Sequence, residues 1–345
     1  MHFYIGKVAS RLMTTKRRIP LTIQLIIAAI ALVIVMFFGV TLGAANTSIA
    51  DVWHAIWSDN GGEKTDILRG IRFPRVVAAV FVGAALAVAG AIMQGVTRNP
   101  LADPGLLGLT SGANAALAVG FVLFPTIGYT GSVVACLIGA AIGMGIVYGI
   151  SASSKKGMSP LKLVLAGAAV SMFLQAVADG TGLLFQLSKN VSMWTSGGLQ
   201  GVTWDILTII PIIILALLIS ILISRQLTIL SLNEEVAVGL GQKTFLIKSV
   251  MFIVVVLLAG TAVALVGNLA FVGLMIPHIV RAIVGADYRA IIPMSMLVGG
   301  MFMVIVDLIG RTMNAPFETP VVALVAVIGL PFFLVLVKRG GRFFA

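Results

Sequence analysis

The sequence predicts an all-α integral membrane protein with ten transmembrane helices and with both termini in the cytoplasm. Three observations indicate this: the composition, the lengths of the apolar runs and the placement of the basic residues. Of the 345 residues, 59% are hydrophobic and only 10% are charged. An ordinary soluble domain is about 45–50% apolar and about 25% charged. The composition therefore excludes a soluble enzyme, a nucleic-acid-binding protein and a disordered chain.

Apolar runs give the number of spans. A helix needs about 20 apolar residues to cross a hydrocarbon core about 30 Å thick. Ten runs of roughly this length follow one another, at 20–43, 74–96, 105–125, 128–150, 161–187, 204–224, 245–266, 269–284, 291–313 and 319–338. The eighth run is the shortest and ends in Pro277, His278 and Arg281. A short or broken segment of this kind is tolerated only where protein buries it or where it lines a cavity.

The basic residues test this count independently. With the N-terminus in the cytoplasm, 17 of the 23 lysines and arginines fall on internal segments. The other six are external, namely Lys64, Arg69, Arg72, Arg75, Lys189 and Arg311. This excess is the positive-inside pattern, and an odd number of spans would place the basic C-terminal end outside.

We therefore expect one polytopic domain over residues 1–345. It consists of a cytoplasmic segment at 1–19, a ten-helix bundle at 20–338 and a cytoplasmic loop at 226–244. The basic N-terminal segment and the run that follows could imitate a cleaved signal peptide. That run is longer than the 7–15 residues or so of a signal-peptide core, so we interpret it as the first transmembrane helix.

Small residues recur at four-residue spacing, for example Gly83 with Ala87, and Gly139 with Gly143. Faces of small residues let helix backbones approach closely in lipid. This pattern predicts a closely packed bundle but says nothing about a substrate.

Motifs for covalent chemistry are absent from the sequence. It contains no phosphate-binding Gly-x-x-x-x-Gly-Lys-Ser/Thr, Gly-x-Ser-x-Gly, His-Glu-x-x-His or Cys-x-x-Cys pattern. The three histidines, His2, His54 and His278, are scattered, and the single Cys136 cannot form a disulfide within the chain. The sequence therefore predicts a protein that is not an enzyme and has neither a metal site nor a cofactor.

Ionisable residues at membrane depth are rare and usually face a protein interior or an aqueous cavity. Asp179 lies in the second half of the run at 161–187, where it is either a pathway residue or a residue at a hydrated helix end. Asp307 and Arg311 are four residues apart on one helix. This spacing favours a structural ion pair.

Three external arginines, Arg72, Arg75 and Arg311, lie close to helix ends against the positive-inside bias. They could bind lipid headgroups or extend toward the membrane surface. Alternatively, they could dock an acidic partner on the outer face, because arginine forms directed bidentate contacts with carboxylates.

The longest internal loop contains a short amphipathic segment between the sixth and seventh runs. Glu234 and Glu235 come early in it, and Gly239 and Gly241 come at its end, as the rules for helix ends require. The segment is either a plain connector or a short helix on the cytoplasmic face that docks into a soluble partner.

Several longer motifs occur in order along the chain. They are Arg72-Phe73-Pro74-Arg75, Gly90-Ala91-x-x-Gln94, the segment 98–104 (Arg-Asn-Pro-Leu-Ala-Asp-Pro), Leu107-Gly108, the segment 271–281, Asp307-x-x-x-Arg311, Glu318-x-Pro320 and Gly329-x-Pro331-Phe332. Together they resemble the FecCD family, the permease subunits of type II ABC importers for iron-siderophore complexes and cobalamin. The resemblance covers about 70–338.

The resemblance implies the type II ABC importer permease fold, with two permease subunits around a central pathway in the bacterial cytoplasmic membrane. It also implies cytoplasmic ATPase subunits, which hydrolyse ATP, and an extracytoplasmic lipoprotein or periplasmic binding protein, which delivers the ligand. The expected ligand is a ferric siderophore, first of the hydroxamate type, with cobalamin or haem as alternatives. No nucleic-acid partner is expected.

The resemblance also assigns roles to single residues. Arg72, Arg75 and Arg311 match positions that dock the binding protein. The inner segment matches the coupling helix that fits the ATPase, with Glu234, Glu235, Ala237, Gly239, Leu240 and Gly241. Its opening Leu232-Asn233 departs from the usual Leu-Gly. Candidates for the pathway or gate are Gln94, Asn99, Ser159, Pro160, Leu161 and Asp179.

A secondary transporter driven by an ion gradient is the alternative from another class. Such proteins often contain inverted repeats with helices broken at glycine. The stretches 83–108 and 260–290 share a loose Gly/Ala-rich pattern of this kind. The inner loop separates the two classes, because a secondary transporter needs no helix for docking an ATPase.

Overall fold

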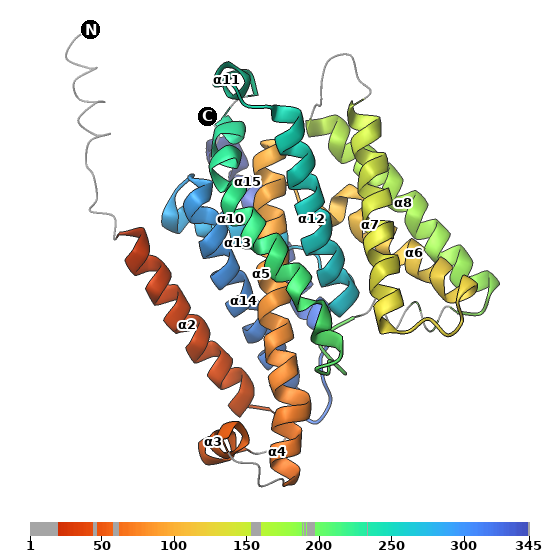
Figure 1. The fold of residues 1–345 in the computed structure, drawn as a ribbon, viewed down its shortest axis with the longest axis vertical. Coiled ribbons are helices and arrows are strands. Elements are labelled where there is room, and N and C mark those ends of the chain that lie inside the picture. The colour runs from red at the N-terminus through yellow and green to blue at the C-terminus, as the bar shows by residue number, and fades with distance from the viewer. Residues whose placement is uncertain are drawn as a thin grey trace.

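A computed structural model describes residues 20–343, apart from 44–46, 58–61, 153–159, 188, 190, 192–196 and 233. The described chain is a bundle of α-helices (Figure 1). The long helices are α2 (Leu21–Thr41), α5 (Phe73–Thr97), α7 (Tyr129–Ala152), α8 (Pro160–Leu184), α10 (Ile210–Leu232), α12 (Thr244–Val266), α14 (Tyr288–Thr312) and α15 (Val321–Phe343). Two shorter apolar helices, α6 (Leu109–Leu123) and α13 (Val272–Val284), complete the set. These two and the apolar part of α15 (Val321–Leu336) are shorter than the seven helices that are long and apolar enough to cross a membrane.

Each of the ten predicted apolar runs coincides with one of these helices. The short helix α11 (Glu234–Gly239) lies at one end of the bundle, and α2 begins in the same half of the molecule (Figure 1). Helices α3 (Ile49–Trp57) and α4 (Glu63–Ile67) lie at the opposite end. This arrangement agrees with the predicted topology, in which the first group is cytoplasmic and the second is external.

The second transmembrane helix begins earlier than hydropathy indicates. Helix α4 leads through a π-helical turn, η1 (Leu68–Arg72), directly into α5, so that one helical rod runs from Glu63 to Thr97. Hydropathy locates only the apolar part of a helix, which is the part inside the membrane. The first turns of this helix are polar and lie outside the membrane, so hydropathy does not detect them. The rod carries Arg72 and Arg75 at the point where it enters the apolar region.

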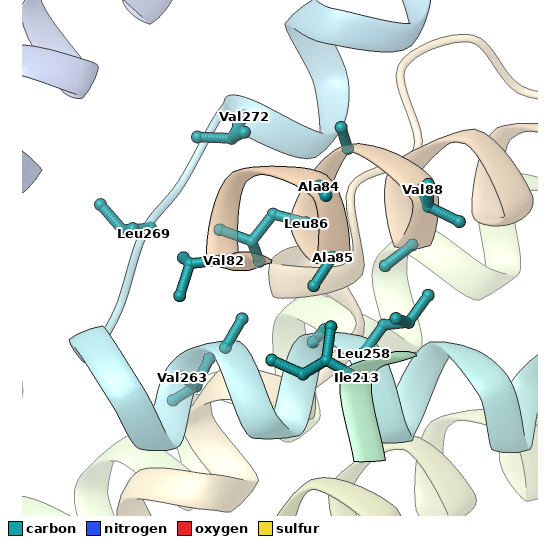
Figure 2. Close-up of a cluster of buried hydrophobic side chains, with 14 of the residues drawn as sticks. Val82, Ala84, Ala85, Leu86, Val88, Ile213, Leu258, Val263, Leu269 and Val272 are labelled. Atoms are coloured by element: carbon teal, nitrogen blue, oxygen red, sulfur yellow. The ribbon is translucent and has the colours of Figure 1, made fainter. Parts of the chain in front are cut away.

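Helix α5 is the centre of the bundle and packs against α10, α12, α13 and α14. Figure 2 shows part of this core, where Ala85 of α5 points toward Ile213 of α10 and Leu258 of α12. Helix α2 is mostly exposed along its length. A helix that faces lipid can expose apolar side chains, whereas the side chains of α5 must pack against neighbouring helices on every side.

The predicted close packing is confirmed at glycine pairs. Gly83 of α5 lies against Gly299 of α14, and Gly112 of α6 lies against Gly139 of α7. A Cβ atom added to any of these four residues would overlap the carbonyl oxygen of its partner. Because backbone atoms cannot move aside as a side chain can, these positions require glycine.

We predict that Gly83→Ala destabilises the protein, because the new methyl group would force α5 and α14 apart. Overpacking of this kind costs about 1–3 kcal/mol. The matched control is Gly145→Ala in α7, where nothing lies within 4 Å of the added carbon. Thermal unfolding of the detergent-purified protein would show a lower midpoint for the first variant only. Equal midpoints would contradict the contact.

Candidate functional site

Two arginines and two carboxylates form a network at the outer end of the bundle. The Arg75 guanidinium contacts Asp307 of α14, with Nε 2.9 Å from Oδ1, and donates to both oxygens of Glu318 at 2.9 and 3.0 Å. Arg311 Nε lies 3.0 Å from Asp307 Oδ2. This contact confirms the predicted i, i+4 ion pair. The four charges offset one another, which a buried network requires.

Arg72 and Arg311 also donate to carbonyl oxygens in the last turn of α2. Arg72 Nη1 lies 2.9 Å from the carbonyl oxygen of Val40 and 3.0 Å from that of Thr41. Arg311 Nη2 lies 2.8 Å from the carbonyl oxygen of Gly39. The last four carbonyls of a helix have no partner within the helix, and the negative end of the helix dipole attracts cations. The two arginines therefore cap α2.

These contacts bury all three arginines that the sequence marks as docking candidates. Arg72 is 4% exposed, and Arg75 and Arg311 are each 6% exposed. Their charges are engaged within the chain: the end of α2 and the Thr47 hydroxyl, 2.7 Å from Arg72 Nη1, accept from Arg72, and the two carboxylates accept from Arg75. The Glu318 side chain, in contrast, is 32% exposed. Burial raises the pKa of Glu318, but the hydrogen bonds and charge of Arg75 outweigh burial and hold it below its ordinary value.

A second polar contact joins α5 to α13 in the interior. Pro277 has no N–H group, so the carbonyl oxygen of Gly273 lacks its helical donor. Gln94 Nε2 lies 3.2 Å from this oxygen and 3.2 Å from that of Leu274. Gly90, one turn earlier on α5, lies so close to Gly273 that a Cβ atom would overlap its backbone. In the Gly-Ala-x-x-Gln motif, the glycine thus lets α5 approach α13 closely, and the glutamine supplies the hydrogen-bond donor that the carbonyl oxygen of Gly273 lacks.

The remaining pathway candidates differ in their surroundings. Gln94 is buried and bonded, so it does not line an open path in this structure. Asn99 is half-buried and accepts a hydrogen bond from the N–H of Leu101 at 3.0 Å, which shapes the loop after α5. Ser159 lies outside the described residues, and Pro160 and Leu161 form the first turn of α8.

Asp179 is exposed on α8, where its Oδ1 accepts a hydrogen bond from Gln175 at 2.9 Å. Met172, Phe173 and Leu183 on the same helix are also largely exposed. An ionised carboxylate is expensive in hydrocarbon and therefore faces water or protein. The exposed side of α8 near Asp179 is accordingly not a plain lipid-facing surface.

The inner segment contains a helix, α11, which is the second of the two interpretations that the sequence left open and the one that the family resemblance implies. Its Ala237 is buried, whereas Val236, Val238 and Leu240 are exposed. Gly241 ends the segment with φ of 79°, a left-handed conformation that favours glycine. Exposed apolar side chains at the water-facing end of the bundle are typical of an interaction surface.

Sequence reasoning did not select two carboxylates, Glu318 and Asp103. Glu318 lies in a quoted motif, yet its sequence position gives no sign that it binds Arg75 across the fold. Asp103 is buried, and its Oδ1 accepts a hydrogen bond from the N–H of Gly105 at 2.8 Å. Burial raises the pKa of Asp103 to about 6, although the hydrogen bond from Gly105 lowers it in part. A residue type in a motif does not reveal its burial.

The ten apolar helices of the described chain define a multi-pass membrane protein. The chain belongs to the FecCD transport family, whose sequence profile matches residues 10–339. It is thus a permease subunit of the ABC transporter type, located in the cytoplasmic membrane.

Known relatives agree over nearly the whole chain. The iron(3+)-hydroxamate import system permease protein FhuB of Bacillus subtilis is 41% identical over 343 residues, which are 99% of this chain and 89% of that protein. The hemin transport system permease protein HmuU of Yersinia pestis is 35% identical, over 90% of this chain and 93% of that protein. A solved metal-chelate type ABC transporter in an inward-facing conformation matches with a TM-score of 0.77 at 28% identity, covering 91% of this chain and 98% of that chain.

We predict that Arg75→Gln destabilises the protein far more than Glu318→Gln does. Loss of Arg75 leaves Asp307, which is fully buried, with one partner fewer. Breaking a buried ion pair costs about 3–5 kcal/mol, whereas an exposed pair contributes about 0–1 kcal/mol. Thermal unfolding of both detergent-purified variants measures the difference. If the two midpoints fall equally, Arg75 is not the centre of the network.

Proposed function

We propose that the chain carries a ferric siderophore of the hydroxamate type across the cytoplasmic membrane, as one subunit of an ATP-driven importer. Cytoplasmic ATPases supply the energy, and an extracytoplasmic binding protein delivers the ligand. The substrate class rests on the name of the FhuB relative, which is 41% identical. Haem is the second candidate, because the HmuU relative transports hemin by its name.

The observation that carries this proposal is the surface of α11. Helix α11 lies at one end of the bundle (Figure 1), and Val236, Val238 and Leu240 are exposed there, whereas Ala237 is buried. Apolar side chains exposed to water at this end indicate a soluble protein partner. An ion-driven transporter has no need of such a surface. We therefore assign the loop 226–244, with Glu234, Glu235, Gly239 and Gly241, to coupling with the ATPase.

The pathway is proposed along the exposed side of α8. Asp179 and Gln175 cannot remain against lipid, so a second permease subunit or a water-filled space must face them. Two subunits that face each other across α8 would enclose a polar path for a chelate. This arrangement suits a pair of identical chains and a pair of related chains equally.

Docking of the binding protein is proposed at the outer network. Arg72, Arg75 and Arg311 are buried, so the accessible member is Glu318, beside the exposed Phe317. An acidic side chain of the partner can reach Arg75 by taking the place of Glu318. Arginine and carboxylate groups form the same bidentate contact in either case.

Cysteine cross-linking tests the two partner surfaces. We predict that Val238→Cys cross-links to the ATPase and that Phe317→Cys cross-links to the binding protein, because both side chains are exposed at opposite ends. The native Cys136 is buried, so the unchanged chain is the matched control. Mass spectrometry of the cross-linked products from native membranes identifies the partners. Absence of an ATPase at Val238→Cys, in membranes where the complex is otherwise active, would contradict the importer.

Uptake assays test the pathway and the substrate. We predict that Asp179→Leu lowers uptake of a radiolabelled ferric hydroxamate, because it removes the polar group that faces the path, while the ATPase still co-purifies. Met172→Leu on the same helix is the control, since it exchanges one exposed apolar side chain for another. Competition with unlabelled haem or cobalamin identifies the substrate class. Unchanged uptake by Asp179→Leu would exclude the residue from the path.

A further inference from the structure

A chain of hydrogen bonds crosses the bundle between the α5–α13 contact and the α10 end of the coupling loop. At its centre, Arg281 of α13 donates from Nη1 to Gln94 Oε1 at 2.7 Å and from Nη2 to the Tyr288 hydroxyl at 2.7 Å. Tyr288 is the first residue of α14 and is buried. One guanidinium group thus connects α5, α13 and α14.

The chain continues from Tyr288 to the last turns of α10. The backbone N–H of Tyr288 donates to Thr228 Oγ1 at 3.0 Å. The Thr228 hydroxyl lies 3.0 Å from Asp287 Oδ1 and 3.1 Å from the carbonyl oxygen of Ser224, and Asp287 in turn caps the start of α14. Thr228 lies one turn before the end of α10 at Leu232, which directly precedes α11. The hydrogen bonds therefore reach the base of the proposed coupling loop.

The absence of a side chain at Gly95 leaves room for this series of hydrogen bonds. Gly95 of α5 faces Tyr288 and Leu227, and a Cβ atom at Gly95 would lie 2.6 Å from Leu227 Cδ1 and 2.9 Å from the Tyr288 hydroxyl oxygen. Helices α5, α10 and α14 therefore meet here at close range. A shift of the end of α10 cannot leave Tyr288 in place without a loss of contact.

Arg281 also decides which way the Gln94 amide points. A guanidinium group has only donors, so it requires the amide oxygen, and the amide nitrogen is left for the carbonyls of Gly273 and Leu274. These carbonyls belong to the first turn of α13, where Pro277 has removed a helical donor. The position of Arg281 thereby controls how firmly α13 is held against α5.

We propose that Thr228, Tyr288, Arg281 and Gln94 form a relay that transmits movement of the coupling loop to α13, with Arg281 as its central positioning residue. This inference rests on the proposed function, because the loop moves only if an ATPase binds it. Energetic coupling between distant sites requires an element whose arrangement both sites influence. Helix α13 is such an element, since a hydrogen bond from outside the helix completes its first turn.

The test uses the assembled importer, with its ATPase and binding protein, in vesicles. The variants are Thr228→Val and Tyr288→Phe, which each remove one hydroxyl oxygen from the relay and nearly conserve volume. Thr312→Val is the control, because the Thr312 hydroxyl bonds only to the carbonyls of its own helix. The measurements are ATP hydrolysis and the number of ferric hydroxamate molecules imported per ATP hydrolysed.

We expect the two relay variants to hydrolyse ATP within about twofold of the unchanged chain, while import per ATP falls about 3- to 10-fold, the effect of one lost hydrogen bond. The double variant should lose no more than the worse single variant, because both break one chain. Import per ATP that stays unchanged in both variants, or losses that multiply in the double variant, would overturn the relay. Tyr288→Phe alone decides the matter if Thr228→Val does not assemble.

The outcomes also separate this inference from the proposed function. If the unchanged chain neither binds an ATPase nor imports the chelate, the proposed function fails. If the unchanged chain imports normally and the relay variants match it, only the relay fails.

Discussion

Hydrocarbon offers no hydrogen-bond partner, so every polar backbone group at membrane depth must be satisfied within the protein. Helix α13 cannot meet this requirement alone, because Pro277 removes the donor for the carbonyl of Gly273. Gln94 supplies that donor from α5, and Gly90 brings the two helices close enough for it to reach. Since α5 also packs against α10, α12 and α14, the placement of a short, broken helix is tied to the central helix of the bundle.

The same requirement explains the outer arginines. The end of α2 exposes carbonyl oxygens with no partner within the helix, and Arg72 and Arg311 bind them. Arg75 and Arg311 then offset the buried charge of Asp307. Cations that contravene the positive-inside bias are therefore kept at the outer end by local anions and helix-end carbonyls. Any acidic partner must compete with these internal acceptors, and Glu318 is the most accessible of the network.

Two surfaces carry groups that no contact within the protein shields from an unfavourable solvent. Asp179 is exposed on a transmembrane helix, and α11 exposes valine and leucine at the end that faces water. A carboxylate in lipid and apolar groups in water are both unfavourable. A hydrated helix end, another protein chain or an aqueous path would remove the cost at Asp179, and a protein partner would remove it at α11. These two mismatches between side chain and solvent, and not any catalytic group, are the features from which we propose transport and assembly with other subunits.

The number of apolar helices, the topology and the Asp307–Arg311 pair could be predicted from the sequence alone, whereas the short inner helix was one of two interpretations that the sequence left open. Each depends on local terms: the transfer of single side chains to lipid, the placement of lysine and arginine, and the i, i+4 spacing. The contacts of Arg75 with Glu318, of Arg72 with α2 and of Arg281 with Gln94 join residues far apart in the chain. Only the tertiary structure decided them, because the partner of a buried polar group depends on which helices pack together, and local sequence does not contain that information.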